Sequence, residues 1–412
     1  MSSFRKWLLL LVVLLVVSAS AFGAGIAVDR SGALPGSLHA QPDDVSSRFS
    51  VFWEAWGLVH DHFVDRSKLD DKTLTYGAVQ GMVESLGDTG HTRFLNPQDA
   101  SFEASDLSGS FEGIGAQLGE KDGYPVIIAP LDGSPAERAG ILAGDVIVQV
   151  NGQSVAGVSV DKVVGLVRGP KGSSVTLTVI HPGQSALTEV SIQRETIQVH
   201  AVTWTMIPGT RVAHLRMSQF TATVNQELIS ALKEIKGAGA QALVVDVRNN
   251  PGGVLEQAVA VTSQFLSSGN VLLEQDADGK RKPTPVSPGG LATDIRMVTL
   301  INLGSASAAE IFAGAIQDQK RGQLVGDTSF GTGTVLTPFP LSDGSVLFLG
   351  TSEWLTPSGR EIWKQGIAPD VRVSLPSGVT PLSPSKEKGM TPEQVQASGD
   401  AQLLKAVELL GK

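Results

Sequence analysis

Residues 302–315 read NLGSASAAEIFAGA and follow an apolar, strand-like run at residues 297–301. From Ala308 onward, apolar residues recur at three- and four-residue spacing, which predicts a helix. A small polar cluster between a strand and a helix can display a nucleophile, because the first N–H groups of the helix stabilise developing negative charge. Ser305 and Ser307 are therefore the candidate nucleophiles.

The same serines also have a structural interpretation. Glu310 stands three residues after Ser307, and a serine followed by glutamate at this spacing is the capping box that begins many helices. This stretch alone does not separate a nucleophile from a helix cap, so the decision depends on the rest of the sequence.

A second motif, DVRNNPGG at residues 246–253, follows another apolar run at residues 242–245. A continuous apolar strand is typical of a sheet that is covered on both faces. Strand and helix patterns alternate over residues 196–375, which predicts an α/β sheet. Asp246 and Arg248 are expected to pair across the turn and to serve the architecture.

Residues 108–195 form a different kind of segment, with short strands, glycine turns and short helical patterns. FEGIGAQL at residues 111–118 and SPAERAGILAGDVI at residues 134–147 carry the pattern, which resembles a PDZ-like domain. In such a domain an extended peptide adds to a sheet edge, and its terminal carboxylate meets backbone N–H groups. The candidate carboxylate loop consists of Gly113, Ile114 and Gly115. The alternative is a PDZ-like domain that serves only as an internal scaffold.

The order of these features resembles that of the carboxy-terminal processing peptidases, also called tail-specific proteases. The PDZ-like segment comes first, then D-x-R-x-N-x-G-G, then N-x-G-S-A-S, and the likeness extends over residues 47–374. The resemblance makes Ser307 the nucleophile. It also implies oxyanion donors from the backbone of Gly252, Gly253 and Ala308, which suits the open backbone of glycine.

The general base of this family is missing from the sequence. The family usually continues G-x-P-T-F-G-K-G-T-V-Q, in which the lysine removes the serine's proton and the glutamine orients the lysine. The matching residues 326–336 read GDTSFGTGTVL, with Thr332 at the lysine position and Leu336 at the glutamine position. A threonine hydroxyl is not a general base near neutral pH, so the usual Ser-Lys dyad cannot operate.

His91 is the candidate replacement base. It lies in the glycine-rich turn GDTGHTRF at residues 87–94, and imidazole titrates near neutrality. The tricorn-type peptidases, a related branch, use a histidine from a comparable place, before the PDZ-like domain. Asp88 or Glu361 is a candidate orienting partner. The structural alternative is a turn histidine whose ring is satisfied by the backbone.

Taken together, these residues predict a serine endopeptidase that cleaves proteins near their carboxy-terminal tails and reads the tail through the PDZ-like domain. Its partners would be proteins or peptides with free carboxy-terminal tails. Two alternatives stay open. A lysine from elsewhere, Lys364 or Lys320, reaches the serine, or the chain is a catalytically inactive pseudo-peptidase that acts as a PDZ peptide-binding or regulatory module.

Composition limits the remaining possibilities. The formal net charge of -9 gives no reason to expect nucleic acid, which favours basic faces. The sequence contains no cysteine, so disulfides and cysteine metal sites are excluded. No metal-binding spacing of histidines is present, and a hydrolase of this kind needs no cofactor.

The amino terminus indicates the compartment. Within residues 1–28, Arg5 and Lys6 precede an apolar run that ends in small residues, which is the order of a secretory signal. The uncharged stretch is also just long enough to span a bilayer core of about 30 Å. We expect an exported protein of the cell envelope, anchored in the membrane by this segment or secreted after its cleavage.

The sequence predicts a mixed α+β and α/β multidomain fold. After residues 1–28 come a linker at 29–46, a helical segment at 47–107, the PDZ-like domain at 108–195, the α/β peptidase core at 196–375, and a flexible linker with a C-terminal helix at 376–412. In the helical segment an aromatic stripe recurs at helical spacing and is expected to be core: Phe49, Phe52, Trp53 and Trp56.

Overall fold

The computed structural model describes residues 49–88, 91–121, 123–131, 133–377 and 379–411. The expectations for residues 1–28 and 29–46 lie outside these described residues. The chain divides into two compact units, Met1–Gly77 and Ala78–Lys412, so the boundary falls inside the predicted helical segment 47–107. Among the described residues, no helix is long and apolar enough to cross a membrane.

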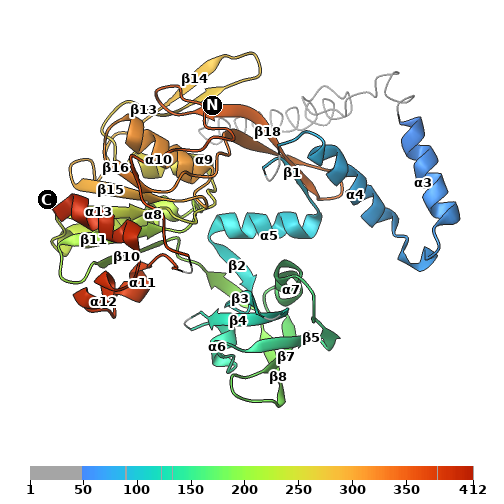
Figure 1. The fold of residues 1–412 in the computed structure, drawn as a ribbon. Helices are drawn as coiled ribbons and strands as arrows, with labels where there is room; N and C mark the ends of the chain where they lie inside the picture. The colour runs from blue at the N-terminus through green and yellow to red at the C-terminus, as the bar shows by residue number, and fades with distance from the viewer. Residues whose placement is uncertain (1–48, 89–90, 122, 132, 378, 412) are drawn as a thin grey trace, which may run out of the picture. The chain divides into compact units, whose positions relative to one another are not determined.

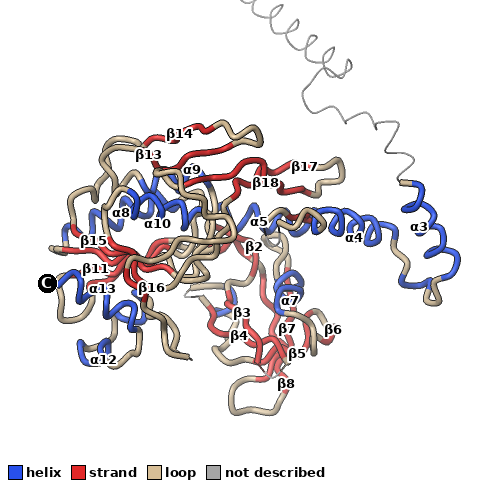
Figure 2. The backbone as a smooth tube through the Cα atoms, turned by 45° about the horizontal axis from the view of Figure 1, so that its top comes forward, coloured by secondary structure: helices blue, strands red, loops and turns tan. Residues whose placement is uncertain are grey.

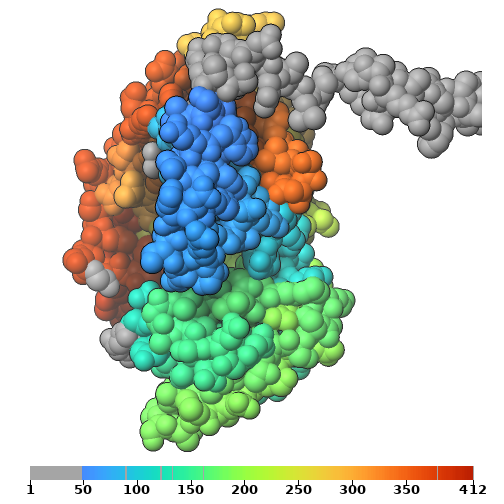
Figure 3. All heavy atoms as spheres, turned by 90° about the vertical axis from the view of Figure 1, so that its right-hand side faces the viewer, coloured from blue at the N-terminus to red at the C-terminus, as the bar shows by residue number. Residues whose placement is uncertain are grey.

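The first unit contains α3 (Ser50–His62), the short 3-10 helix η1 (Arg66–Lys68) and the start of α4 (Asp71–Glu84). The prediction that its aromatic stripe is core is wrong, because α3, whose atoms are blue in Figure 3, has no buried residue. The rings pack along the helix against each other instead. Phe52 and Trp53, for example, have centroids 5.1 Å apart, and the side chain of Trp53 remains 62% exposed.

The second unit is built on a six-stranded sheet with the order β10-β11-β12-β15-β16-β19 (Figure 1). Only β10 is antiparallel to its neighbour, and the other strands run parallel. The strands are β10 (Val202–Met206), β11 (Val212–Met217), β12 (Ala242–Asp246), β15 (Arg296–Ile301), β16 (Gln323–Gly326) and β19 (Val371–Arg372).

Helices cover both faces of this sheet, as the apolar strands predict. Leu243 and Val245 of β12 pack in the cluster that contains α8 (Val224–Gly237), α9 (Leu255–Thr262) and α10 (Ala308–Asp318). The alternate residues Ala242 and Val244 pack in a second cluster with α13 (Ala401–Gly411). Figure 2 shows α8 and α10 on one side of the strands and α13 on the other. The α/β prediction is confirmed.

A second sheet has the order β1-β18-β13-β14, with β17 paired to β18. Its strands are β1 (Arg93–Leu95), β13 (Asn270–Gln275), β14 (Arg281–Pro285), β17 (Thr334–Pro340) and β18 (Val346–Leu355). β17 and β18 form the hairpin that continues from the Thr332 loop. β1 pairs with β18, with Phe94 opposite Leu347, and so ties the turn that carries His91 to this sheet.

The PDZ-like segment has its own sheet and its own core. The sheet has the order β3-β4-β5-β7-β8, with β6 on β5, and its core includes Ile127, Ile147 and Leu177. Its elements are β3 (Ala116–Lys121), β4 (Tyr124–Pro130), α6 (Pro135–Arg138), β5 (Val146–Val150), β6 (Gln153–Ser154), α7 (Val160–Val167), β7 (Ser174–Ile180) and β8 (Leu187–Gln193). The flanking elements are α5 (Pro97–Ser108) and the paired strands β2 (Ser110–Gly113) and β9 (Glu195–Gln198).

The C-terminal segment differs from its prediction. In place of a flexible linker and one helix, it forms α11 (Pro384–Glu387), α12 (Pro392–Gln396) and α13. Leu382 is 7% exposed, and Glu387 is fully buried. Glu387 bonds the ring of His214 in β11 at 2.5 Å, so this proline-rich stretch is held by a buried ion pair that its composition does not reveal.

Candidate active site

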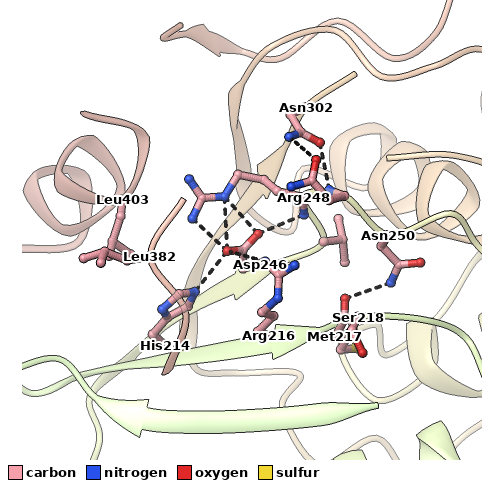
Figure 4. A network of polar contacts seen from close by, with 12 residues as sticks. His214, Arg216, Met217, Ser218, Asp246, Arg248, Asn250, Asn302, Leu382 and Leu403 are labelled. Carbon is pink, nitrogen blue, oxygen red and sulfur yellow. Dashed lines mark hydrogen bonds and ion pairs between the residues drawn. The ribbon is translucent and has the colours of Figure 1, made fainter. Parts of the chain in front are cut away.

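The two sequence motifs meet at one edge of the central sheet. β12 and β15 are parallel neighbours, so the loops that follow them start side by side. Asn249 N–H donates to the side-chain oxygen of Asn302 at 2.8 Å, and Asn302 returns a hydrogen bond of 2.8 Å to Asn249 (Figure 4). Ala306 N–H donates to the carbonyl of Asn250 at 2.9 Å. These bonds fix the loop that presents Ser307.

Ser307 is the N-cap of α10 and has a backbone conformation that disfavours L residues. Its φ of 52° and ψ of -117° lie in a region that glycine prefers. Such strain persists only where surrounding contacts impose it, and it clusters at functional sites. Gly252 lies directly against Ser307, because a Cβ on that glycine would lie 2.7 Å from the Cβ of Ser307. Ser305 is instead fully buried and donates to the carbonyl of Val247 at 2.8 Å.

Glu310 organises the loop at the family's lysine position. Its fully buried carboxylate accepts hydrogen bonds of 2.6 to 3.0 Å from the Ser307 N–H, the Ser329 hydroxyl, the Gly331 N–H, and both the N–H and the hydroxyl of Thr332. The Thr332 hydroxyl also accepts the Ser307 N–H at 2.9 Å. Glu310 thus makes the expected bond to the N–H of the N-cap residue Ser307 and, in addition, anchors a second loop.

Ser307 opens onto a cleft of about 880 Å³. His91, Thr332, Thr334 and Trp354 also line this cleft, but none of its lining residues is a lysine. Lys320 and Lys364, the two alternative bases, are exposed and do not line it. Among the residues that line the cleft, His91 carries the group whose basicity suits neutral pH, because imidazole titrates in that range.

His91 is buried, with 7% of its surface exposed, and Nδ1 of its ring forms a hydrogen bond with the hydroxyl of Thr334. Burial lowers the pKa of His91, because the charged imidazolium loses water; Asp88 opposes this shift and Arg93 adds to it. The suggested orienting partners do not hold the ring. The Asp88 carboxylate accepts from the hydroxyl of Thr92 at 2.6 Å, and Glu361 is exposed.

The three expected oxyanion donors lie around Ser307 but are not equivalent. The Gly252 N–H already donates to the side chain of Asn250 at 2.9 Å. Gly253 has a φ of 141°, and a Cβ there would lie 2.3 Å from the carbonyl oxygen of Phe220, so only glycine fits. Ala308 is the first residue of α10, where N–H groups have no partner within the helix. Gly253 and Ala308 are the stronger candidates.

A buried charge network lies behind this edge of the sheet (Figure 4). Arg248 Nη2 contacts Asp246 at 2.8 Å, and its Nη1 contacts Asp400 of the C-terminal segment at 2.8 Å. Burial alone would raise the pKa of Asp246, but Arg248 and His214 outweigh it and hold that pKa far below its usual range. The predicted pairing of Asp246 with Arg248 is confirmed.

The PDZ-like sheet carries a groove of about 320 Å³ between β3 and α7. Ile114 and Gly115 line it, whereas Gly113 ends β2 and pairs with Glu195. Gly115 has a φ of 73°, and a Cβ there would lie 2.5 Å from Ser134, so glycine is required. The other lining residues are mostly apolar and include Leu118, Val164 and Val167.

Fold and site together define a serine hydrolase with a peptide-binding domain. A family profile described as peptidase family S41 matches residues 211–373, and one described as a PDZ domain matches residues 126–180. The chain is 35% identical to the carboxy-terminal processing protease CtpA of Bacillus subtilis, over 90% of this chain and 78% of that protein. It is also 35% identical to CtpB of the same organism, over 78% of this chain and 67% of that protein.

The photosystem II D1 C-terminal processing protease is a solved structure with 30% identity and a TM-score of 0.48, over 79% of this chain and 94% of that chain. By its identity to CtpA over most of both chains, the protein belongs to peptidase family S41. It is a serine-type peptidase of the carboxy-terminal processing kind that carries a PDZ domain.

Proposed function

We propose that the protein is an exported endopeptidase that cleaves other proteins near their carboxy-terminal tails, with Ser307 as nucleophile and His91 as general base. One observation supports this assignment above all: Ser307 and His91 line a single cleft in which no lining residue is a lysine. The strained backbone of Ser307 adds to the argument, because strain of this kind clusters at functional sites.

In this mechanism the neutral ring of His91 takes the hydroxyl proton as Ser307 Oγ attacks the scissile carbonyl. The carbonyl oxygen becomes an oxyanion, which the N–H groups of Gly253 and Ala308 stabilise. The imidazolium then gives its proton to the leaving amine, and an acyl-enzyme remains. Water, deprotonated by His91, hydrolyses the ester and restores Ser307.

The groove lined by Ile114, Gly115 and Leu118 is the proposed tail-reading site. Its apolar lining suits an apolar tail, and an extended peptide can add to the edge of the neighbouring strand. The substrates would be proteins with free, unstructured carboxy-terminal tails.

The test is cleavage of an unfolded protein with an apolar tail by the purified full-length chain. Ser307→Ala and His91→Ala should each abolish turnover, by about 10³-fold or more. His200→Ala is the matched control, because that side chain is 78% exposed and should tolerate the change. Activity that survives Ser307→Ala would refute the nucleophile assignment.

A pseudo-peptidase would give a different pattern. The parent would bind tails without turnover, and the observation that favours this outcome is Thr332, whose hydroxyl is committed to Glu310 and the Ser307 N–H. Thr332→Lys restores the residue type of the family at this position. Activity gained only in that variant would show that the parent lacks a base.

Export and membrane attachment are proposed from the sequence of residues 1–28. Fractionation of cells that express the full-length chain should recover it in the envelope, whereas a chain without residues 1–28 should remain in the cytoplasm. Recovery of both chains in the same fraction would contradict the proposal.

A further inference from the structure

The hydrogen bond between His91 and Thr334 joins two groups that are separated by most of the chain. Both side chains are buried, at 7% and 8% exposed, and both line the cleft onto which Ser307 opens. A buried polar pair at a cleft wall needs a reason, because each group lost its water when the chain folded.

One strand fixes both partners. Thr334 begins β17 and lies opposite Glu353 of β18. The His91 turn reaches the same strand through Thr92, whose hydroxyl accepts the Gly350 N–H at 3.0 Å. A Cβ on Gly350 would lie 3.2 Å from Asp88 Oδ2 and 3.2 Å from the Cβ of Thr334. Strand β18 therefore sets the position of Thr334 relative to the histidine.

We infer that Thr334 is the positioning residue of the general base, and that it holds His91 through a neutral hydroxyl where the Ser-His-Asp triad uses a carboxylate. This inference rests on the proposed role of His91. A neutral imidazole carries one ring proton. When Nδ1–H donates to Thr334 Oγ1, the lone pair of Nε2 is left to take the proton of Ser307. In this arrangement the hydroxyl holds the orientation of the ring and stabilises the tautomer with the proton on Nδ1.

A hydroxyl at this place has a chemical consequence. It does not add a negative charge beside the ring, so it gives the imidazolium little of the stabilisation that a carboxylate would give. The charged groups around His91 are Asp88 and Arg93, and Arg93 is itself paired with Glu103 at 2.6 Å. Burial has a larger effect than either charged group, so the pKa of His91 lies below its ordinary value. The ring is therefore neutral at neutral pH and can accept a proton.

The first test compares Thr334→Val with Thr334→Ser in the full-length chain. Valine keeps the shape of the side chain but removes the hydrogen bond, so kcat should fall about 10- to 100-fold with KM nearly unchanged. Serine keeps the hydroxyl and should recover most of the activity. Thr351→Val is the matched control, because Thr351 lies on β18 in the same sheet and its hydroxyl contacts Thr337 at an exposed position.

The second test uses the pH profile. Thr334→Asp places a carboxylate against Nδ1, which raises the pKa of His91. The acid limb of kcat/KM should then move upward by about one pH unit or more. An acid limb that does not move would show that position 334 does not contact the ring of the catalytic base, and would contradict the inference.

A third readout does not need activity. The ¹⁵N shifts of His91 in the Ser307→Ala protein should report a neutral ring protonated at Nδ1, and Thr334→Val in that background should shift the tautomer equilibrium. A ring protonated at Nε2, or Thr334→Val with the parent's kcat and pH profile, would overturn the inference. If His91→Ala is inactive while Thr334→Val is fully active, only this inference fails. If His91→Ala is active, the proposed base fails as well.

Discussion

At the scale of single residues, the site is defined by contacts between loops that are distant in the sequence. The capping pattern of Ser307 with Glu310 could be recognised from spacing, and its bond from the Ser307 N–H to the Glu310 carboxylate forms at 2.9 Å. The further bonds from Glu310 to Ser329 and Thr332 could not be predicted, because they exist only when the loop after β16 folds over the start of α10. The same holds for the partner of His91, since no spacing links it to Thr334.

The strain at Ser307 leads to a stability prediction. Ser307→Ala and Ser307→Gly should both be inactive, but the glycine variant should be the more stable by about 1 kcal/mol, because glycine tolerates the positive φ. Urea denaturation measures the difference. Ser230 is the control, because it is exposed in the middle of α8. There the glycine variant should be the less stable by about 1 kcal/mol. The same sign at both positions would mean that Ser307 is not strained.

His91 predicts an acid-sensitive stability. Its pKa in the unfolded chain is about 6.5, and burial lowers it in the folded protein. The unfolded state therefore binds the proton more tightly, so this contribution is fully present above about pH 6.5 and is lost as the pH falls through the folded pKa. The free energy of unfolding of the parent should decrease more steeply between about pH 7 and 5 than that of His91→Gln. Parallel curves would contradict the lowered pKa.

At the scale of elements, the parallel strands and their covering helices could be predicted well. The apolar run of β12 is a local signal, and the strand ends within one residue of the expected range 242–245. The C-terminal segment was mispredicted because its order depends on partners in the core. Asp400 accepts from Arg248 and from the N–H groups of Leu382 and Leu403, which ties the segment to the sheet.

Asp400→Ala should therefore destabilise the whole second unit. The change leaves Arg248 buried with one carboxylate fewer and removes the acceptor at the start of α13, which together should cost about 3–5 kcal/mol. Asp278→Ala is the control, since Asp278 is exposed in the turn before β14, and its cost should be below about 0.5 kcal/mol. Thermal unfolding followed by circular dichroism measures both. Equal midpoints in the two variants would show that the network does not hold the C-terminal segment.

The titration of His214, which bonds Glu387 of the C-terminal segment, changes the stability with pH in the direction opposite to that of His91. Burial by itself lowers the pKa of His214, but its hydrogen bonds to Asp246 and Glu387 outweigh burial and raise it. The raised pKa means that this stability is present below about pH 6.5 and is lost as the pH rises through the folded pKa. The central sheet and the cleft wall thus depend on pH in opposite directions, which favours a maximum of stability between the two transitions.

At the scale of the whole molecule, one chain carries both a PDZ domain and a peptidase cleft. The order of motifs in the sequence predicted both, because glycine turns and strand lengths are local properties. Sequence could not separate a tail reader from a scaffold, since that distinction depends on whether a groove stays open. The structure has a groove between β3 and α7 that is lined by Val164 and Val167, which supports tail reading as the proposed role.

Val164→Asp tests whether the groove of the PDZ domain binds tails independently of cleavage in the cleft. The carboxylate would oppose an apolar tail and its terminal charge, so KM for a tailed protein should rise at least about tenfold. The kcat/KM for a short peptide too small to reach the groove should stay within about twofold, because the cleft is untouched. Leu166→Asp is the matched control on the same helix, since Leu166 is 41% exposed and does not line the groove. Equal losses on both substrates would mean that the PDZ domain supports the fold of the peptidase and does not read tails.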